Sequence, residues 1–116
     1  MAYDEALTAR FRETLTGMVG ISEKKMMGGV CFMLNGNMIG GAHREKNGDG
    51  RFMFRVGKDN HEAAQARPGA MPMDFTGRVM RGFVFIDADD CADAVLQDWI
   101  SFALSFAATL PPKPGK

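Results

Sequence analysis

The Asn35-Gly36 pair constrains the fold of this chain more than any other feature, because it predicts where one strand turns back on another. A type I′ turn needs positive φ at both central residues, and Asn-Gly satisfies this need well. Apolar residues are frequent on both sides of the pair, in residues 30–34 and 37–42. A two-residue turn then pairs Leu34 with Asn37, Met33 with Met38, Phe32 with Ile39, and Cys31 with Gly40.

Side chains alternate between the two faces of such a hairpin, and the two faces differ in character. One face carries Val30, Phe32, Leu34 and Ile39, and we expect it to join the core. The other carries Cys31, Met33, Met38 and Ala42. The glycine pairs at 28–29 and 40–41 are expected to face each other across the hairpin, where missing side chains permit a bulge or the close approach of a helix.

Periodic patterns predict the other elements. Apolar residues spaced by three or four positions indicate a first helix with one apolar face, formed by Tyr3, Leu7, Phe11, Leu15 and Met18. Residues 51–57 alternate as a half-buried strand, residues 60–66 indicate a short helix that opens with a capping box, and residues 73–75 and 82–87 indicate two more strands. A last helix follows, capped by Asp89 or Asp90 and ended by Pro111-Pro112.

This order of elements, α-β(3)-α-β(2)-α, predicts an α+β fold in two layers, with a mostly antiparallel five-stranded sheet and helices on one face. Helices and strands alternate too unevenly for parallel βαβ units. A chain of 116 residues fits one domain, which we expect over residues 1–110, followed by a disordered tail at 111–116.

Composition argues against several classes of function. The net charge is zero, which disfavours direct nucleic-acid binding through bulk electrostatics. The N-terminal residues lack the pattern of a signal peptide, and no apolar run is long enough to span a bilayer, so we expect a cytoplasmic protein. Cys31 and Cys91 lie far apart in the sequence and are expected to be free thiols.

The candidate chemical groups do not indicate a particular reaction. The glycines of residues 28–41 do not precede a helix, so they do not predict a phosphate site. Cys31, Cys91, His43 and His61 are scattered, and none forms a predicted pair of nucleophile and base. The carboxylates Asp87, Asp89, Asp90 and Asp93 are interpreted as a loop and a helix cap. We therefore expect no enzyme, and we assign no catalytic residue, cofactor or metal.

Basic residues gather in the sheet region, while acidic residues gather near the last helix. If the helices cover one face of the sheet, the other face exposes arginines together with methionines, a composition that is enriched at protein interfaces. The predicted interaction surface consists of Arg51, Arg55, Arg78, Arg81, Met33 and Met38. A solvated sheet face that binds nothing is the alternative interpretation.

Several motifs resemble the TfoX N-terminal domain family. They are "KKMMGG" at residues 24–29, with Met27 where the family commonly has phenylalanine, "RVG" at residues 55–57, and a run in which Met73, Phe75, Thr76, Gly77, Met80, Gly82 and Phe83 match "M-x-F-T-G-x-x-M-x-G-(aromatic)". The resemblance covers nearly the whole chain. It implies the same α-β(3)-α-β(2)-α order and a link to transcriptional regulation of competence, in a stand-alone N-terminal domain. It implies no catalytic residues.

The leading expectation is thus a regulatory domain that works by binding a protein partner, with homodimer formation through an exposed edge strand as a further option. The alternative is a small-molecule or metal-binding domain around Cys31, Met33 and Met38, since thioethers and thiolates are ligands for soft metals.

Overall fold

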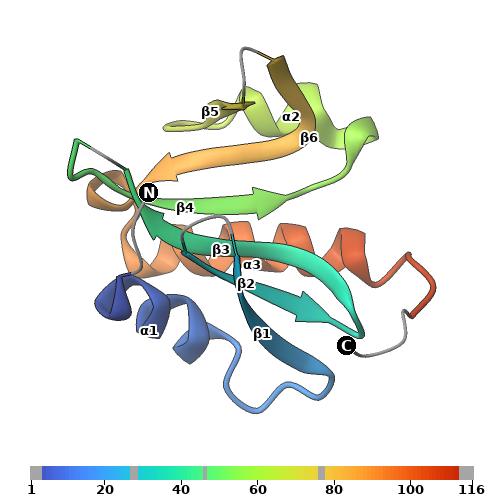
Figure 1. The fold of residues 1–116 in the computed structure, drawn as a ribbon. Helices are drawn as coiled ribbons and strands as arrows, with labels where there is room; N and C mark the ends of the chain where they lie inside the picture. The colour runs from blue at the N-terminus through green and yellow to red at the C-terminus, as the bar shows by residue number, and fades with distance from the viewer. Residues whose placement is uncertain (1–3, 27–28, 46, 76–77, 113–116) are drawn as a thin grey trace.

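The computed structural model describes residues 4–26, 29–45, 47–75 and 78–112. These residues form a sheet of six strands, with α-helices and two short 3-10 helices around it (Figure 1). The elements in chain order are α1 (Glu5–Thr14), β1 (Ile21–Met26), β2 (Gly29–Leu34), β3 (Asn37–Arg44), β4 (Gly50–Arg55), η1 (Lys58–Asn60), α2 (His61–Gln65), β5 (Met71–Phe75), β6 (Arg78–Asp87), η2 (Ala88–Asp90) and α3 (Asp93–Ala107).

The strands lie in the order β1-β2-β3-β4-β6-β5, and every neighbouring pair is antiparallel. The α+β class is confirmed, but the predicted count of five strands is wrong, because β1 was missed. Its sequence, ISEKKM, lacks apolar alternation. It forms a strand because it lies at the edge of the sheet, where only one side of its backbone needs a partner and β2 supplies it.

Helices cover one face of the sheet, as predicted. In Figure 1, α3 runs behind the central strands, and α1 lies below them at the lower left of the view. The ring of Phe11 on α1 stacks on Phe32 of β2, with 4.6 Å between ring centroids, and Trp99 of α3 stacks on Phe54 of β4 at 5.5 Å. Ala64 of α2 belongs to the same buried cluster. The main core therefore lies between the sheet and the helices.

The central hairpin turns at Asn35 and Gly36, whose φ values of 51° and 83° confirm the predicted turn. The predicted register holds for Leu34–Asn37 and Met33–Met38 only. Beyond these pairs a bulge shifts the register, so that Phe32 lies opposite Gly40 and Cys31 opposite Gly41. The predicted pairings Phe32–Ile39 and Cys31–Gly40 are wrong, because β3 contains one residue more than a regular ladder accommodates.

The bulge also moves Ala42 to the opposite face from the one predicted: it lies opposite Val30 and joins the main core. The predicted meeting of two glycine pairs across the hairpin is wrong for the described glycines, because Gly40 and Gly41 lie opposite Phe32 and Cys31. Gly28 lies outside the described residues. Gly40 does occupy the bulge, as the interpretation of these glycines anticipated. A Cβ at position 40 would overlap the carbonyl oxygen of Met53 and lie 3.2 Å from Cζ of Phe11.

Helix starts differ from the predicted caps. Asn60 makes no capping hydrogen bond, and its Nδ2 instead donates to the carbonyl oxygen of Val56 at 2.8 Å. Asp89 and Asp90 lie in η2, and α3 begins after Ala92, with Asp93 in its first turn. At the other end of the chain, Asn37 Nδ2 donates to the carbonyl oxygen of Pro111 at 2.9 Å, so the predicted tail is tied to β3 at its first residue.

The first helix ends before the predicted apolar stripe does. Met18, which completes that stripe, is 42% exposed and lies outside α1. Tyr3 and the predicted turn at Thr76-Gly77 lie outside the described residues. None of the helices in the described part of the chain is long and apolar enough to cross a membrane.

Candidate functional site

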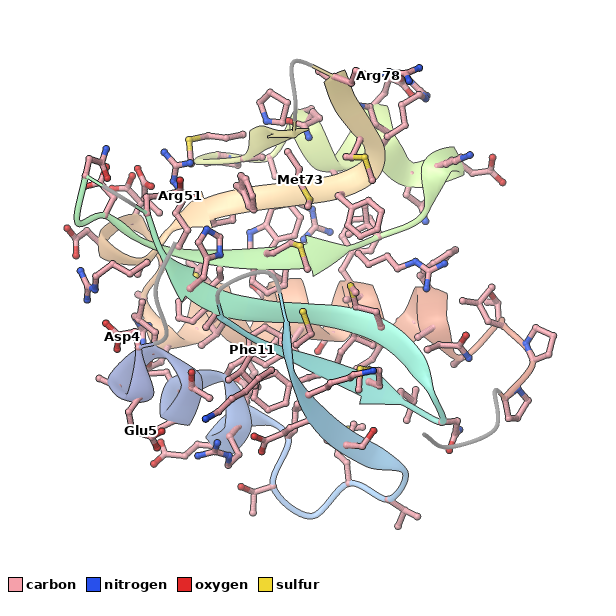
Figure 2. All side chains as sticks on the ribbon, viewed as in Figure 1. Asp4, Glu5, Phe11, Arg51, Met73 and Arg78 are labelled. Carbon is pink, nitrogen blue, oxygen red and sulfur yellow. The ribbon has the colours of Figure 1, made fainter. Side chains whose placement is uncertain are left out.

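A second, smaller cluster lies on the sheet face opposite the helical layer. We call it the methionine face, and it consists of the buried residues Cys31, Met53, Met73 and Phe85 with the partly buried Met33, Met38, Met71 and Phe83 around them. Figure 2 is viewed onto this side and shows sulfur atoms spread across the strands, with Met73 beside β6. Five of its eight members are methionines, whose flexible thioethers adapt to irregular contacts.

Strand register assembles the centre of the methionine face. Cys31, Gly41, Met53, Phe85 and Met71 form one continuous row across five strands. Partners in a row point to the same side of the sheet. Because Gly41 has no side chain, the row has a gap between Cys31 and Met53, and these two residues belong to one packed cluster.

A polar network closes one end of the face. His43, Arg51 and Asp87 form the next row along the strands. Arg51 Nε donates to Asp87 Oδ1 at 3.1 Å, and His43 Nε2 lies 2.5 Å from Oε2 of Glu45. The His43 ring and the Arg51 guanidinium both pack against Phe85, with centroid distances of 5.3 and 5.6 Å. Arg51 is therefore held in place by carboxylates and an aromatic ring.

The opposite end of the face continues into a cleft. Arg55 lies two residues beyond Met53 on β4 and pairs with Phe83 of β6. Its guanidinium reaches the ring of Phe106 on α3, with 5.3 Å from Cζ to the ring centroid. Arg55, Phe83 and Phe106 all line a cleft of about 630 Å³.

The predicted interaction residues fall into three places. Met33 and Met38 lie opposite each other on the methionine face, and Arg51 lies in the polar network at its end. Arg55 and Arg81 line the cleft, where Arg81 forms an ion pair with Glu62 at 3.0 Å. Arg78 is exposed at the start of β6. Methionines and arginines thus meet at the two ends of one face, and Arg78 lies apart from both.

Neither cysteine is placed for nucleophilic chemistry. Burial raises the pKa of the Cys31 thiol. Burial also raises the pKa of Cys91 to about 11, against an opposing effect of the nearby Arg10. A thiolate is the form that attacks electrophiles and binds soft metals, so both sites disfavour it. Cys31 shares its cluster with Met33 and Met38, as predicted, but as a buried neutral thiol.

The remaining candidate groups are engaged in a hydrogen bond or in ion pairs. His61 is buried, and its Nδ1 accepts a hydrogen bond from the backbone N–H of Gly82 at 3.0 Å. Asp87 pairs with Arg51, and Asp93 pairs with Arg10 at 3.0 Å. Among the described residues, no group of three or more histidine, cysteine or acidic side chains is arranged to hold a metal ion.

Sequence reasoning missed part of the methionine face. Of its eight residues, the predicted surface included Met33 and Met38 alone. The alternation of Phe83, Phe85 and Asp87 along β6 was the signal that pointed to one face. Their contact with Cys31 and Met53 depends on the strand order, which places β6 beside β4.

The fold places the chain in the class of two-layer α+β domains. Its antiparallel sheet has a helical layer on one face and a sulfur-rich cluster on the other. A family model for the TfoX N-terminal domain matches residues 13–107, and the chain belongs to that family. No curated protein and no solved structure matches the chain.

Proposed function

We propose that this domain is a non-enzymatic regulatory module that binds another protein through the methionine face. Its family takes its name from the competence regulator TfoX, so we place the binding event in a regulatory pathway of that kind. The partner segment we envisage presents an apolar side chain to Met33 and Met38. A carboxylate beside it would meet Arg55 at the end of the face, which makes the partner's surface apolar and acidic.

One observation carries this proposal. Met33, Met38, Met71 and Phe83 remain partly exposed on the methionine face, although the helices of the described chain pack on the other side of the sheet. Four large apolar side chains in one accessible cluster are unusual for a solvated sheet face. Methionine and arginine are both enriched in protein interfaces.

The chemistry of the candidate groups supports a binding role over a catalytic one. The two thiols have raised pKa values because they are buried. His61 is engaged with a backbone N–H, and His43 is engaged with Glu45 at the closed end of the face. A nucleophile with an adjacent base, the usual minimum for covalent catalysis, has no counterpart among these residues.

Site-specific photo-crosslinking in the native cell tests the proposal. Benzoylphenylalanine is placed at Met38 on the methionine face or, as a matched control, at Ser101, which is exposed on α3. We expect the Met38 position to capture one protein reproducibly and the Ser101 position not to capture it. With that protein purified, Met38→Glu should weaken binding at least tenfold, because a carboxylate would be desolvated in an apolar contact.

Two results would contradict the proposal. One is capture from Ser101 with none from Met38, which would place the interface on the helical side. The other is unchanged affinity in Met38→Glu, provided that circular dichroism shows the variant to be folded.

A further inference from the structure

The cleft at the end of β4 has walls that the fold builds from distant segments. It lies between the end of β4, η1, the bend of β6 and the C-terminal half of α3, and its volume of about 630 Å³ suits a small organic molecule. Phe83, Phe102 and Phe106 provide apolar walls. Two of these rings come from α3 and one from β6, so the cleft exists only in the folded chain.

Glycine at position 57 lets Phe106 form one wall. A Cβ at this position would lie 3.0 Å from Cζ of Phe106 and closer still to two other ring carbons. The ring therefore packs directly against the backbone of Gly57. A Cβ at Gly82 would lie 2.8 Å from the carbonyl carbon of Gly57, so the two backbone segments also touch each other. The back of the cleft is thus tightly packed main chain.

Arg55 supplies a positive charge that no carboxylate neutralises among the residues the structure describes. Its guanidinium carbon lies 5.3 Å from the centroid of the Phe106 ring. Arg51 on the same strand differs, since Asp87 and Glu45 both pair with it. A guanidinium that rests on an aromatic face keeps its N–H donors available in a fixed direction.

The other charges in the cleft leave it positive. Lys58 lines it and is exposed, and Arg81 lines it while paired with Glu62. Asp59 is the one carboxylate among the lining residues described. An anion that enters therefore meets Arg55 and Lys58 without having to displace an existing ion pair of either residue.

Parts of two family motifs meet at this cleft. Arg55 and Gly57 belong to the "RVG" motif, and Gly82 and Phe83 end the "M-x-F-T-G-x-x-M-x-G-(aromatic)" run. The packing of Gly82 on Gly57 brings them together, although they lie far apart in sequence. Residues of two of the three family motifs therefore line one cleft.

We propose that this cleft binds a small organic carboxylate with an aromatic or similarly apolar body. The carboxylate pairs with Arg55, assisted by Lys58, and the body lies against Phe102 and Phe106. The cleft shares Arg55 and Phe83 with the protein-binding surface, but Lys58, Phe102 and Phe106 belong to the cleft alone. A ligand here would add a second, small-molecule input to the domain.

Titration of the ¹⁵N-labelled protein followed by NMR tests the proposal, with indole-3-acetate as the probe. We expect saturable shifts at the amides of Gly57, Gly82 and Phe106. Indole-3-acetamide, which lacks the charge, and acetate, which lacks the apolar body, should each bind at least tenfold more weakly, since a charge-assisted hydrogen bond and the ring contact are lost in turn.

Variants locate the binding. Arg55→Gln should weaken indole-3-acetate binding at least tenfold, and Ser105→Trp, at an exposed position in the cleft wall, should block it. Arg78→Gln is the matched control, because Arg78 is exposed on β6 but does not line the cleft. The proposal would be overturned if no shifts appear at 10 mM probe, a concentration about a hundredfold above the Kd of a site of moderate affinity. Equal binding of the acetamide would also overturn it, as would unchanged binding in Arg55→Gln and Ser105→Trp with the native spectrum retained.

Discussion

At the scale of single residues, Gly40 shows how one missing side chain settles a local structure. It lies at the bulge of β3, beneath the Phe11 ring and against the carbonyl of Met53. A methyl group there would clash with its neighbours, which are backbone atoms and a ring packed in the core and cannot easily move. The bulge, the seat of α1 on the sheet and the register of the hairpin therefore depend on the same position.

Gly40→Ala should lower the free energy of unfolding by about 2–4 kcal/mol, through overlap with backbone and core. Urea denaturation measures the loss. Gly48→Ala is the control: its φ of 95° is equally unusual for alanine, but a Cβ there meets nothing within 4 Å. It should cost about 1 kcal/mol, from backbone strain alone. Equal losses in the two variants would show that packing at the bulge is unimportant.

The burial of Cys91 shows why the reactivity of a thiol was hard to judge from the sequence. Cys91 follows η2 and precedes a helix, a position that favours a thiolate by itself. Burial outweighs that effect and raises the pKa of Cys91 to about 11. Whether a side chain is buried depends on neighbours from distant segments, and spacing along the chain does not reveal them.

At the scale of elements, β1 is a strand made by its surroundings. Ser22, Glu23, Lys24 and Lys25 are all exposed, and the strand pairs only with β2. Arg12 on α1 holds it with two hydrogen bonds to Glu23, of 2.6 and 2.8 Å. Charged residues on the β1 edge and Pro72 within β5 on the other edge both disfavour pairing with a second sheet. Self-association through an edge strand stays an untested prediction, and these two features argue against it.

Glu23→Gln should loosen β1 selectively. Hydrogen exchange at the β1 amides is expected to rise by a few-fold, the effect of losing a partly exposed ion pair, while exchange in β4 stays unchanged. Exchange followed by mass spectrometry or NMR measures this. Glu62→Gln removes another arginine pair, with Arg81, and should leave β1 unaffected. Uniform acceleration in both variants would mean that the Arg12–Glu23 pair does not anchor the strand.

At the scale of the whole molecule, two carboxylates join α1 to the sheet. Asp4 accepts a hydrogen bond from the backbone N–H of Leu7, which lowers its pKa, and Arg44 on β3 lowers it further. The hydrogen bond from Arg12 lowers the pKa of Glu23. Both groups hold their protons less tightly in the folded state, so their stabilising effect is complete above the ordinary pKa values of 3.8 and 4.5.

The free energy of unfolding should therefore fall as the pH drops from about 5 to about 3, through the ordinary pKa values toward the lowered ones. Asp4→Asn should reduce this pH dependence, because asparagine can still cap α1 but does not titrate. Urea denaturation at a series of pH values measures the slope. Asp89→Asn, at an exposed position of η2, is the control and should keep the slope of the unchanged protein. A slope in Asp4→Asn equal to that of the unchanged protein would contradict the assignment.

Much of the architecture could be predicted because it follows from local rules. The Asn35-Gly36 turn, a strand within residues 51–57 and the apolar stripe of α3 each depend on neighbours within a few positions, and each is present in the structure. The strand ends at Arg55, and it is not half-buried as predicted, because Met53 is buried on the second face. The prediction was wrong at β1 and at the bulge, where distant partners decide the outcome. The edge strand β1 pairs with β2 alone, and Gly40 at the bulge packs against Phe11 and the backbone of Met53.

The sequence by itself determined the α+β class, the hairpin turn, the helical layer on one face and the family, because periodicity, turn chemistry and motifs are local properties. Only the tertiary structure decided which side chains share a site. It placed β6 beside β4, and so gathered Cys31, Met53 and Phe85 into one face. It also packed Gly82 on Gly57, and both line a cationic cleft beside Phe106. These contacts depend on strand order and burial, which arise only when the whole chain has folded.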